Sequence, residues 1–211
     1  MSIAYPHINN LAISNLKIRV FLYFCIMKLP IVAYGDPVLK KVCVDIEETY
    51  PDLQQLIKNM FETMYNASGV GLAAPQVGLP IRLFIVDTKG DEDEEAYVKV
   101  FINAQILEET GEPWAFNEGC LSIPEVREDV MRKPNILIRY YDENWKLHEE
   151  KVTGFPARVI QHEYDHIEGK LFTDKLSLLR KQMLKSKLDS ISKGNVHTDY
   201  RMRFPKQNKK R

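Results

Sequence analysis

The chain has 211 residues and is electrically balanced, with 29 basic and 29 acidic side chains. Bulk charge therefore gives no reason to expect a nucleic acid or a membrane surface as a partner. Apolar residues make up 45% of the sequence, which is enough to bury a core without disulfides. The three cysteines, Cys25, Cys43 and Cys120, form no C-x-x-C pair, so we expect one domain in a reducing, cytoplasmic compartment.

An apolar run, VFLYFCIM (20–27), lies near the N-terminus. As a helix it would be about 12 Å long, far short of the ~30 Å hydrocarbon core, so it cannot span a membrane. The sequence KLPIVAYGDP follows directly, without the small-residue cleavage site of a signal peptide. We interpret residues 1–26 as an extension outside the domain, either an added segment or a misassigned start upstream of a natural one at Met27.

The first predicted helix follows a turn at YGDP (34–37) and spans 51–66. Pro51 suits the first helical position, and Gly69 lies just beyond the end. The apolar residues of this segment recur at helical spacing and are Leu53, Ile57, Met60, Phe61 and Met64. This periodicity favours core packing over a stripe of methionine ligands.

Strands are predicted for the middle of the chain. Apolar, β-branched runs at 81–88 and 98–109 indicate two strands, joined by an acidic loop at 91–95. The loop lacks the oxygen spacing of a calcium site, so we interpret it as a solvated turn. Residues 135–154 indicate a hairpin that turns at 142–144.

Two more helices are predicted after this hairpin. The first begins at Gly154-Phe155-Pro156, and Gly169 is placed to end it in a left-handed cap. The second covers 174–192. The remaining residues, 193–211, form a tail whose last stretch, RMRFPKQNKKR, has six basic and no acidic residues. This tail is either solvated and disordered or in electrostatic contact with RNA, as on a ribosome.

The helix that begins at Gly154 carries QHEYDH (161–166), an H-E-x-x-H pattern. His162 and His166 are about one helical turn apart, so both imidazoles point the same way and can reach one ion. Metal-dependent hydrolases use this pattern, with the glutamate, here Glu163, beside the metal's water. Taken alone, the pattern is equally compatible with a structural accident on a helix surface.

A catalytic site of this kind needs a third protein ligand and an open position. Downstream, the nearest alternatives are Asp174 and Asp189. Upstream, Cys120 lies in NEGCLSIPE (117–125), whose glycine and proline break regular structure, so we expect its sulfur on a tight segment with exposed backbone. For Cys43 we expect the more usual role of a small buried hydrophobe.

A glycine-rich stretch, SGVGLAAPQVGLP (68–80), follows the first helix. Its glycines allow close approach of the backbone to a ligand or to a neighbouring strand. It is not a phosphate loop, because the G-x-x-x-x-G-K-[ST] pattern is missing. Judged alone, it is better interpreted as a connector.

Together and in this order, GVGLAAPQ (69–76), EGCLS (118–122) and QHEYDH (161–166) resemble the three motifs of peptide deformylases. The opening LPIVAYGDPVLKK is also similar to that family, and the resemblance covers about residues 28–175. It implies an α+β fold of mostly antiparallel sheets packed around a central metal-binding helix, with an N-terminal and a C-terminal helix. It further implies a catalytic domain over 27–192 that hydrolyses the formyl group from the N-formylmethionine of newly synthesised proteins and releases formate.

The resemblance also implies a catalytic centre. Cys120, His162 and His166 would bind one divalent ion, Fe(II) natively and Zn or Ni as isolated. Glu163 would take the proton of the attacking water and pass it to the departing amine.

Substrate contacts are implied in the same way. The oxyanion donors would be the Gln76 side chain and the Leu121 backbone N–H, and the nascent peptide would lie as an added strand along Val70, Gly71 and Gly119. Arg158 is four residues before His162, so we expect it at the edge of the methionine pocket, with its stem as a wall and its head in water. Asp165 is implied to hold Arg132 in a structural ion pair.

Two rival functions need to be separated from this one. A zinc endopeptidase with the same helix would keep its metal without Cys120 and find its third ligand downstream. A non-catalytic metal-binding or ribosome-associated module would be expected to lack Glu163 or Gln76, and the sequence has both.

Overall fold

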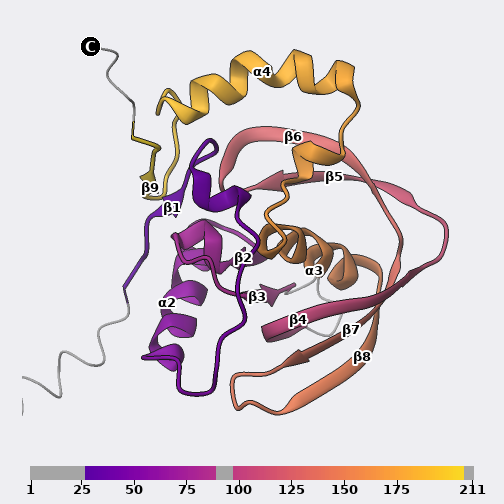
Figure 1. Cartoon of the computed structure of the whole chain (residues 1–211). Helices are drawn as coiled ribbons and strands as arrows, with labels where there is room; N and C mark the ends of the chain where they lie inside the picture. The colour runs from indigo at the N-terminus through magenta and orange to yellow at the C-terminus, as the bar shows by residue number, and fades with distance from the viewer. Residues whose placement is uncertain (1–26, 89–96, 207–211) are drawn as a thin grey trace, which may run out of the picture.

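The structure is a computed structural model that describes residues 27–88 and 97–206 (Figure 1). The elements, in chain order, are β1 (Ile31–Val32), η1 (Pro37–Lys40), α2 (Leu53–Asn66), β2 (Gly71–Ala73), η2 (Ala74–Val77), β3 (Leu83–Asp87), β4 (Val98–Thr110), β5 (Trp114–Cys120), β6 (Ile123–Arg132), β7 (Asn135–Tyr141), β8 (Leu147–Thr153), α3 (Gly154–Ile167), η3 (Phe172–Lys175), α4 (Leu178–Ser192) and β9 (Met202–Arg203). The expected extension at 1–26 and the acidic loop at 91–95 lie outside the described residues. Within the described ranges, no helix has the length and apolar character needed to cross a membrane.

A five-stranded sheet of order β2-β3-β4-β7-β8 forms the base of the fold, and all its strand pairs are antiparallel. Successive side chains of a strand point to opposite faces of a sheet. On β3, Leu83 and Ile85 accordingly pack in the cluster that contains the apolar face of α2, whereas Phe84 and Val86 pack in the cluster that contains α3. The two helices therefore cover opposite faces of the sheet.

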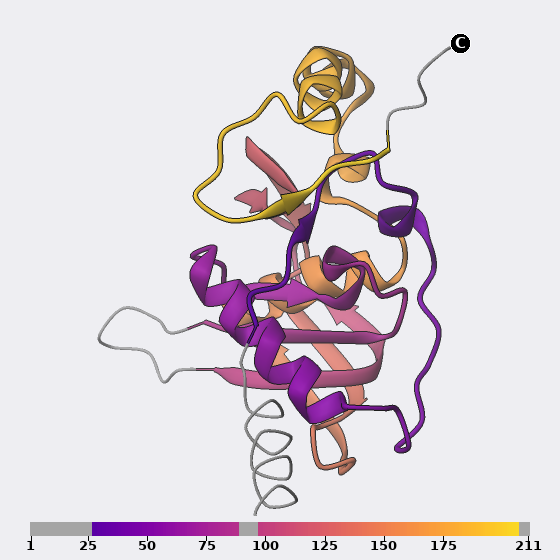
Figure 2. The same cartoon turned by 90° about the vertical axis from the view of Figure 1, so that its left-hand side faces the viewer.

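Helix α3 lies at the centre of the molecule, between the five-stranded sheet and the antiparallel β5–β6 hairpin (Figures 1 and 2). Helix α4 lies over the outer side of that hairpin. Buried residues from β6, η3 and α4 form a third apolar cluster, which includes Val126, Phe172 and Ile191. The predicted α+β class, with antiparallel sheets around a central helix, is confirmed.

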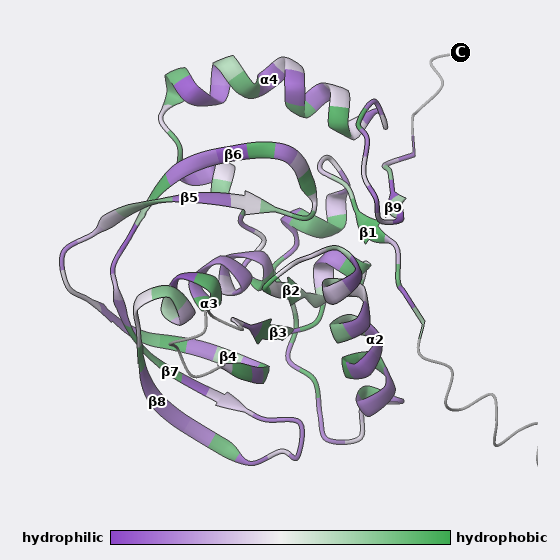
Figure 3. Cartoon of the chain, turned by 180° about the vertical axis from the view of Figure 1, so that it is seen from behind, coloured by the Kyte–Doolittle hydropathy of each residue, from purple (hydrophilic) through white to green (hydrophobic). Residues whose placement is uncertain are grey.

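A short parallel pair joins the two ends of the described chain. Strand β1 pairs with β9, with Ile31 opposite Met202 and Val32 opposite Arg203. Figure 3 shows that β1 is strongly hydrophobic, and both of its residues are fully buried. The basic tail predicted to begin at 193 therefore contains a segment that packs on the domain.

Several element boundaries differ from the predictions. Pro51 lies in a turn before α2, and Asp52, in the left-handed conformation, occupies the N-cap position without a capping hydrogen bond from its side chain. The last helix begins at Leu178 and not at 174, because Ser177 caps its first turn through a bond from the Arg180 N–H. The cap at Gly169, in contrast, is confirmed by its φ of 68°.

Candidate metal centre

Three polar side chains from two separate elements converge in the interior. Cys120 is the last residue of β5, and His162 and His166 project from successive turns of α3. Their ligand atoms all lie within 4.8 Å of one another. The expectation that Cys120 lies on a tight segment is confirmed in part: the residue belongs to strand β5, but the pairing with β6 is irregular between Gly119 and Cys120, and a tight turn follows at 121–122.

The geometry of these atoms fits a metal ion. Bonds of about 2.0–2.3 Å place the ligands of a tetrahedral ion roughly 3.3–3.7 Å apart. The Cys120 Sγ and His166 Nε2 atoms are 3.3 Å apart. Thiolate sulfur and imidazole nitrogen form a donor set that suits iron, zinc or nickel. Within the described residues, this is the group of three that could hold a metal ion, and neither Asp174 nor Asp189 belongs to it.

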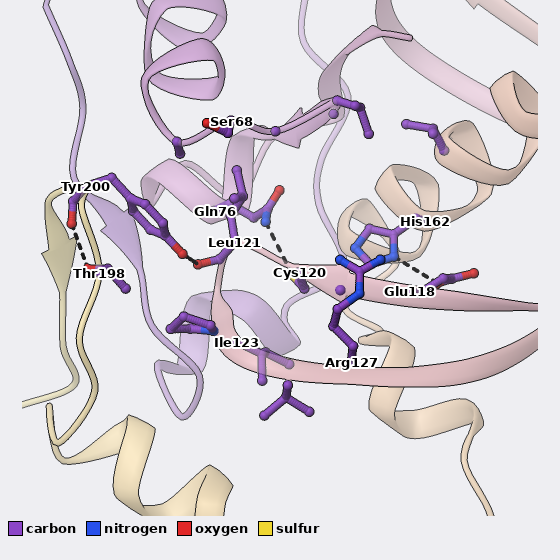
Figure 4. A pocket seen from close by; sticks show the side chains of 18 of the residues that line it. Ser68, Gln76, Glu118, Cys120, Leu121, Ile123, Arg127, His162, Thr198 and Tyr200 are labelled. Carbon is purple, nitrogen blue, oxygen red and sulfur yellow. Dashed lines mark hydrogen bonds and ion pairs between the residues drawn. The ribbon is translucent and has the colours of Figure 1, made fainter. Parts of the chain in front are cut away.

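A buried carboxylate, Glu118, orients one of the histidines (Figure 4). Its Oε2 lies 3.0 Å from His162 Nδ1, which leaves the other ring nitrogen for an ion. Arg132 donates to both Glu118 oxygens, at 2.7 and 3.0 Å. Burial would raise the pKa of Glu118, but the hydrogen bonds with His162 and Arg132 lower it to about 2. Glu118 is thus an ionised partner that fixes the ring of His162.

Glu163 is buried beside the three candidate ligands. Its Oε2 has no hydrogen-bond partner among the described residues. A Cβ atom at Gly71 would lie 2.6 Å from Glu163 Oε1, so only glycine allows β2 to pass this close to the carboxylate. Burial raises the pKa of Glu163 to about 7, whereas a bound cation would act in the opposite direction. The carboxylate is therefore a buried group placed to exchange protons beside the candidate ligands.

Gln76, in η2, reaches the same centre. Its Oε1 accepts a hydrogen bond from the Ala73 N–H at 2.8 Å, which fixes the orientation of the amide. Its Nε2 then points to Cys120 Sγ at 3.5 Å (Figure 4) and to Ser122 Oγ at 3.4 Å. An amide N–H is thereby directed into the site next to the Cys120–Leu121 backbone.

The centre opens into a cleft of about 650 Å³. Val70, Gly71 and Gly119, predicted to contact the substrate, all line it. Phe116 and Phe155 add apolar walls, with their rings 5.5 Å apart. The cleft therefore combines backbone from the start of β2 and the end of β5 with an apolar end.

The prediction for Arg158 is partly wrong. The residue lines the cleft, but only 2% of it is exposed, and its head is not in water. The guanidinium donates to Glu118 Oε1 at 3.1 Å, and it lies over the Trp114 ring at 4.4 Å. Because a buried guanidinium needs acceptors, Arg158 is drawn inward to the carboxylate that also holds His162.

The predicted ion pair between Asp165 and Arg132 is present. Arg132 Nη1 donates to Asp165 Oδ2 at 2.6 Å, with both side chains largely buried. Two functional neighbours were missed by sequence reasoning: Glu118 as the partner of His162, and Tyr200, which lines the cleft from the far end of the chain. For Glu118 a signal existed, since a carboxylate next to a metal-binding motif is a common partner of a ligating histidine.

These features define a class: an α+β protein with a Cys-His-His site whose histidines are buried, an adjacent carboxylate and an open cleft, as expected of a hydrolase with one metal ion. Comparisons with known proteins then specify the family. The family model for polypeptide deformylase matches residues 28–182. The chain belongs to this family.

Curated relatives and solved structures agree with that assignment. The chain is 62% identical over 196 residues to a peptide deformylase of Christiangramia forsetii, covering 88% of this chain and 100% of the relative. It is 60% identical over 189 residues to that of Flavobacterium psychrophilum, with coverages of 84% and 97%. A crystal structure of a peptide deformylase from Legionella pneumophila superposes with a TM-score of 0.71 at 38% identity, covering 80% of this chain and 98% of the other. A Met-Ala-Ser-bound peptide deformylase from Acinetobacter baumannii gives 0.67 at 33% identity, with coverages of 72% and 100%.

The protein is therefore an enzyme, a hydrolase that removes the formyl group from the N-terminus of newly synthesised peptides. Its family depends on a metal ion, and the Cys-His-His group is the candidate site for it.

Proposed function

We propose that Cys120, His162 and His166 bind one divalent ion, natively Fe(II), and that this centre hydrolyses N-formylmethionyl peptides to formate and a free amine. The convergence of one thiol and two imidazoles within 4.8 Å supports the proposal. A bound ion would polarise the formyl carbonyl and lower the pKa of a coordinated water. Zinc and nickel suit the same donor set and are the ions we expect to compete with iron.

Glu163 is the proposed general base and acid. Its buried carboxylate lies beside the candidate ligands, with Oε2 unpaired among the described residues. In the proposed reaction it takes a proton from the attacking water and delivers it to the nitrogen of the methionine as the formyl C–N bond breaks. The products are formate and a peptide with a free N-terminus.

Gln76 and Leu121 are the proposed oxyanion donors. The Gln76 amide points into the site, because its oxygen is held by the Ala73 N–H. The Leu121 N–H follows Cys120 directly, at the start of the β5–β6 turn. Donors that are fixed before the reaction stabilise the developing negative charge without reorganising in the transition state.

The peptide is proposed to lie between two strands, with Val70 and Gly71 on one side and Gly119 on the other. Extended peptides bind by adding a strand to exposed backbone. The apolar end formed by Phe116 and Phe155 is the proposed pocket for the methionine side chain. The buried stem of Arg158 forms another part of this wall.

We also propose that the enzyme meets its substrates at the ribosome in the cytoplasm, with the six basic residues of 201–211 as one contact. Co-sedimentation with ribosomes tests this proposal. If contacts between the basic residues and RNA phosphates supply the affinity, ribosome binding by the full-length chain should weaken steeply with added salt. Binding that does not depend on salt would count against these contacts.

The central test combines metal analysis with formate release from formyl-Met-Ala-Ser. The wild type should contain about one metal ion per chain and release formate. Glu163→Ala should retain the metal but lose activity by at least about 100-fold, in line with the loss of a general base. A Glu163→Ala enzyme with near wild-type turnover would reject the proposed base.

A further inference from the structure

The C-terminal segment beyond α4 returns to the cleft. We define the C-terminal strap as residues 196–203; it ends in β9, which is fastened to β1 by hydrogen bonds of 2.9 Å from the Ile31 and Ala33 N–H groups to strap carbonyls. Within it, residues 197–200 line the cleft together with Cys120 and His162. The family match ends at residue 182, so it assigns no role to the strap.

Tyr200 joins the strap to the backbone of the proposed oxyanion donor. Its hydroxyl donates to the carbonyl of Leu121 at 2.9 Å (Figure 4). The Thr198 hydroxyl donates to the carbonyl of Tyr200 at 2.8 Å, which fixes the strap backbone at the tyrosine. The ring itself is partly buried against the cluster that includes α2. Tyr200 therefore approaches Leu121 from a fixed direction.

The turn that carries the Leu121 N–H is thus held by distant parts of the chain. While Tyr200 holds the carbonyl of Leu121, the carbonyl of Ser122 accepts from the Tyr34 N–H at 2.8 Å. These two hydrogen bonds fix the carbonyls of Leu121 and Ser122. They therefore also fix the backbone that sets the direction of the Leu121 N–H.

The strap also touches the segment that carries the other proposed donor. A Cβ atom at Gly78 would lie 2.6 Å from the guanidinium of Arg203, so the arginine rests on the residue that ends η2. Gln76 lies in this short helix. Both donor-bearing segments are therefore packed against one C-terminal element.

We propose that Tyr200 is a positioning residue of the deformylase reaction, which holds the Leu121 N–H in the orientation needed for the transition state, and that the working domain extends through the strap. The inference rests on the proposed role of Leu121 as an oxyanion donor. A loosened donor costs transition-state stabilisation but leaves substrate binding intact. The expected signature is therefore a lower kcat at constant KM.

The test uses the full chain loaded with its metal and compares Tyr200→Phe with wild type. Phenylalanine keeps the ring and removes only the hydroxyl. Tyr50→Phe is the matched control, because Tyr50 is also partly buried against the α2 cluster but does not line the cleft. For each protein, kcat and KM for formyl-Met-Ala-Ser, inhibition by the product Met-Ala-Ser, metal content and Tm are measured.

Tyr200→Phe should lower kcat by about 3- to 10-fold, the range expected for one hydrogen bond, with KM unchanged. Product inhibition should also be unchanged, because the product has no formyl oxygen to be stabilised. Metal content should match that of Tyr50→Phe, and Tm should fall by at most about 4 °C, as expected for the loss of one hydrogen bond.

Three outcomes would overturn the inference: a kcat equal to wild type, a rise in KM alone, or a fall in kcat that follows a loss of metal. These outcomes leave the proposed function standing, provided that the wild type releases formate. A wild type without formate release would instead refute the proposed function itself.

Discussion

The buried ion pair between Asp165 and Arg132 allows a sharp test of what stabilises the centre. Asp165→Asn keeps the shape of the side chain and removes its charge. In the wild type, two buried carboxylates, Glu118 and Asp165, face the guanidinium groups of Arg132 and Arg158. In the variant only Glu118 would remain as a charged partner. Removing one partner of a buried pair costs about 3–5 kcal/mol, and we expect about 3 kcal/mol here because the Asn oxygen still accepts a hydrogen bond.

For a chain of this length, that loss corresponds to a fall in Tm of about 6–12 °C. Denaturant unfolding of the metal-loaded protein measures the free energy directly. The matched control is Glu149→Gln, whose partner Arg139 is nearly as close, at 2.7 Å, in a pair that is about half exposed. An exposed pair contributes at most about 1 kcal/mol, so this variant should remain near wild type.

Catalysis should suffer less than stability in Asp165→Asn. Arg132 retains both hydrogen bonds to Glu118, and Glu118 retains His162. We expect kcat/KM to fall by less than about tenfold, equivalent to ~1.4 kcal/mol. If Asp165→Asn lost no more stability than Glu149→Gln, the assignment of this pair as a structural support would be refuted.

Three further predictions concern the ligand set, the cleft and acid stability. Cys120→Ala should lose the metal and its activity together, as shown by metal analysis; retention of a full metal complement would favour a downstream ligand. Arg158→Ala should lower kcat/KM for formyl-Met peptides by about 10-fold or more, since it removes a wall of the pocket and a hydrogen bond to Glu118, and unchanged kinetics would reject this role. Burial raises the pKa of Glu150, but hydrogen bonds from Lys99, Tyr140 and Tyr97 lower it overall. Ionised Glu150 therefore stabilises the folded protein above about pH 4.3, and this stabilisation is lost as the pH falls through the depressed folded pKa. Denaturant unfolding should therefore show Glu150→Gln about 1 kcal/mol less stable than wild type at pH 7, and the two converging in acid; a constant difference would contradict this account.

Helix α3 and its cap were predictable from local sequence. Its two histidines lie one turn apart, and glycines mark both ends, at Gly154 and Gly169. Short-range rules of this kind need no knowledge of the rest of the fold. The hairpin formed by β7 and β8 was predictable for the same reason.

The β5–β6 hairpin was missed for a physical reason. Strand β6 alternates between buried and exposed residues, as a strand should, but two of its buried positions are Glu128 and Arg132. Their burial is made possible by partners far away in sequence: Arg180 on α4 for Glu128, and Asp165 on α3 for Arg132. A hydropathy pattern cannot anticipate such compensation, because it scores both residues as exposed.

The candidate metal ligands were only partly predictable. Spacing alone placed His162 and His166 together and left the third ligand open between Cys120 and the downstream aspartates. The family resemblance predicted Cys120 as the third ligand, and the structure shows that the end of β5, which carries Cys120, lies beside α3. Tyr200 had no sequence signal at all, since its position depends on the pairing of β1 with β9.

The parallel pairing of β1 with β9 has a consequence for assembly. The paired residues Ile31 and Met202 lie far apart in the sequence. Closing the chain between them therefore costs more conformational entropy than most other contacts of the fold. Such contacts tend to form late, after local helices and hairpins. On a ribosome, the wall of the cleft that the strap forms would have to wait until residue 203 has emerged, and deletion of residues 202–211 would remove the strand that fastens this wall to β1.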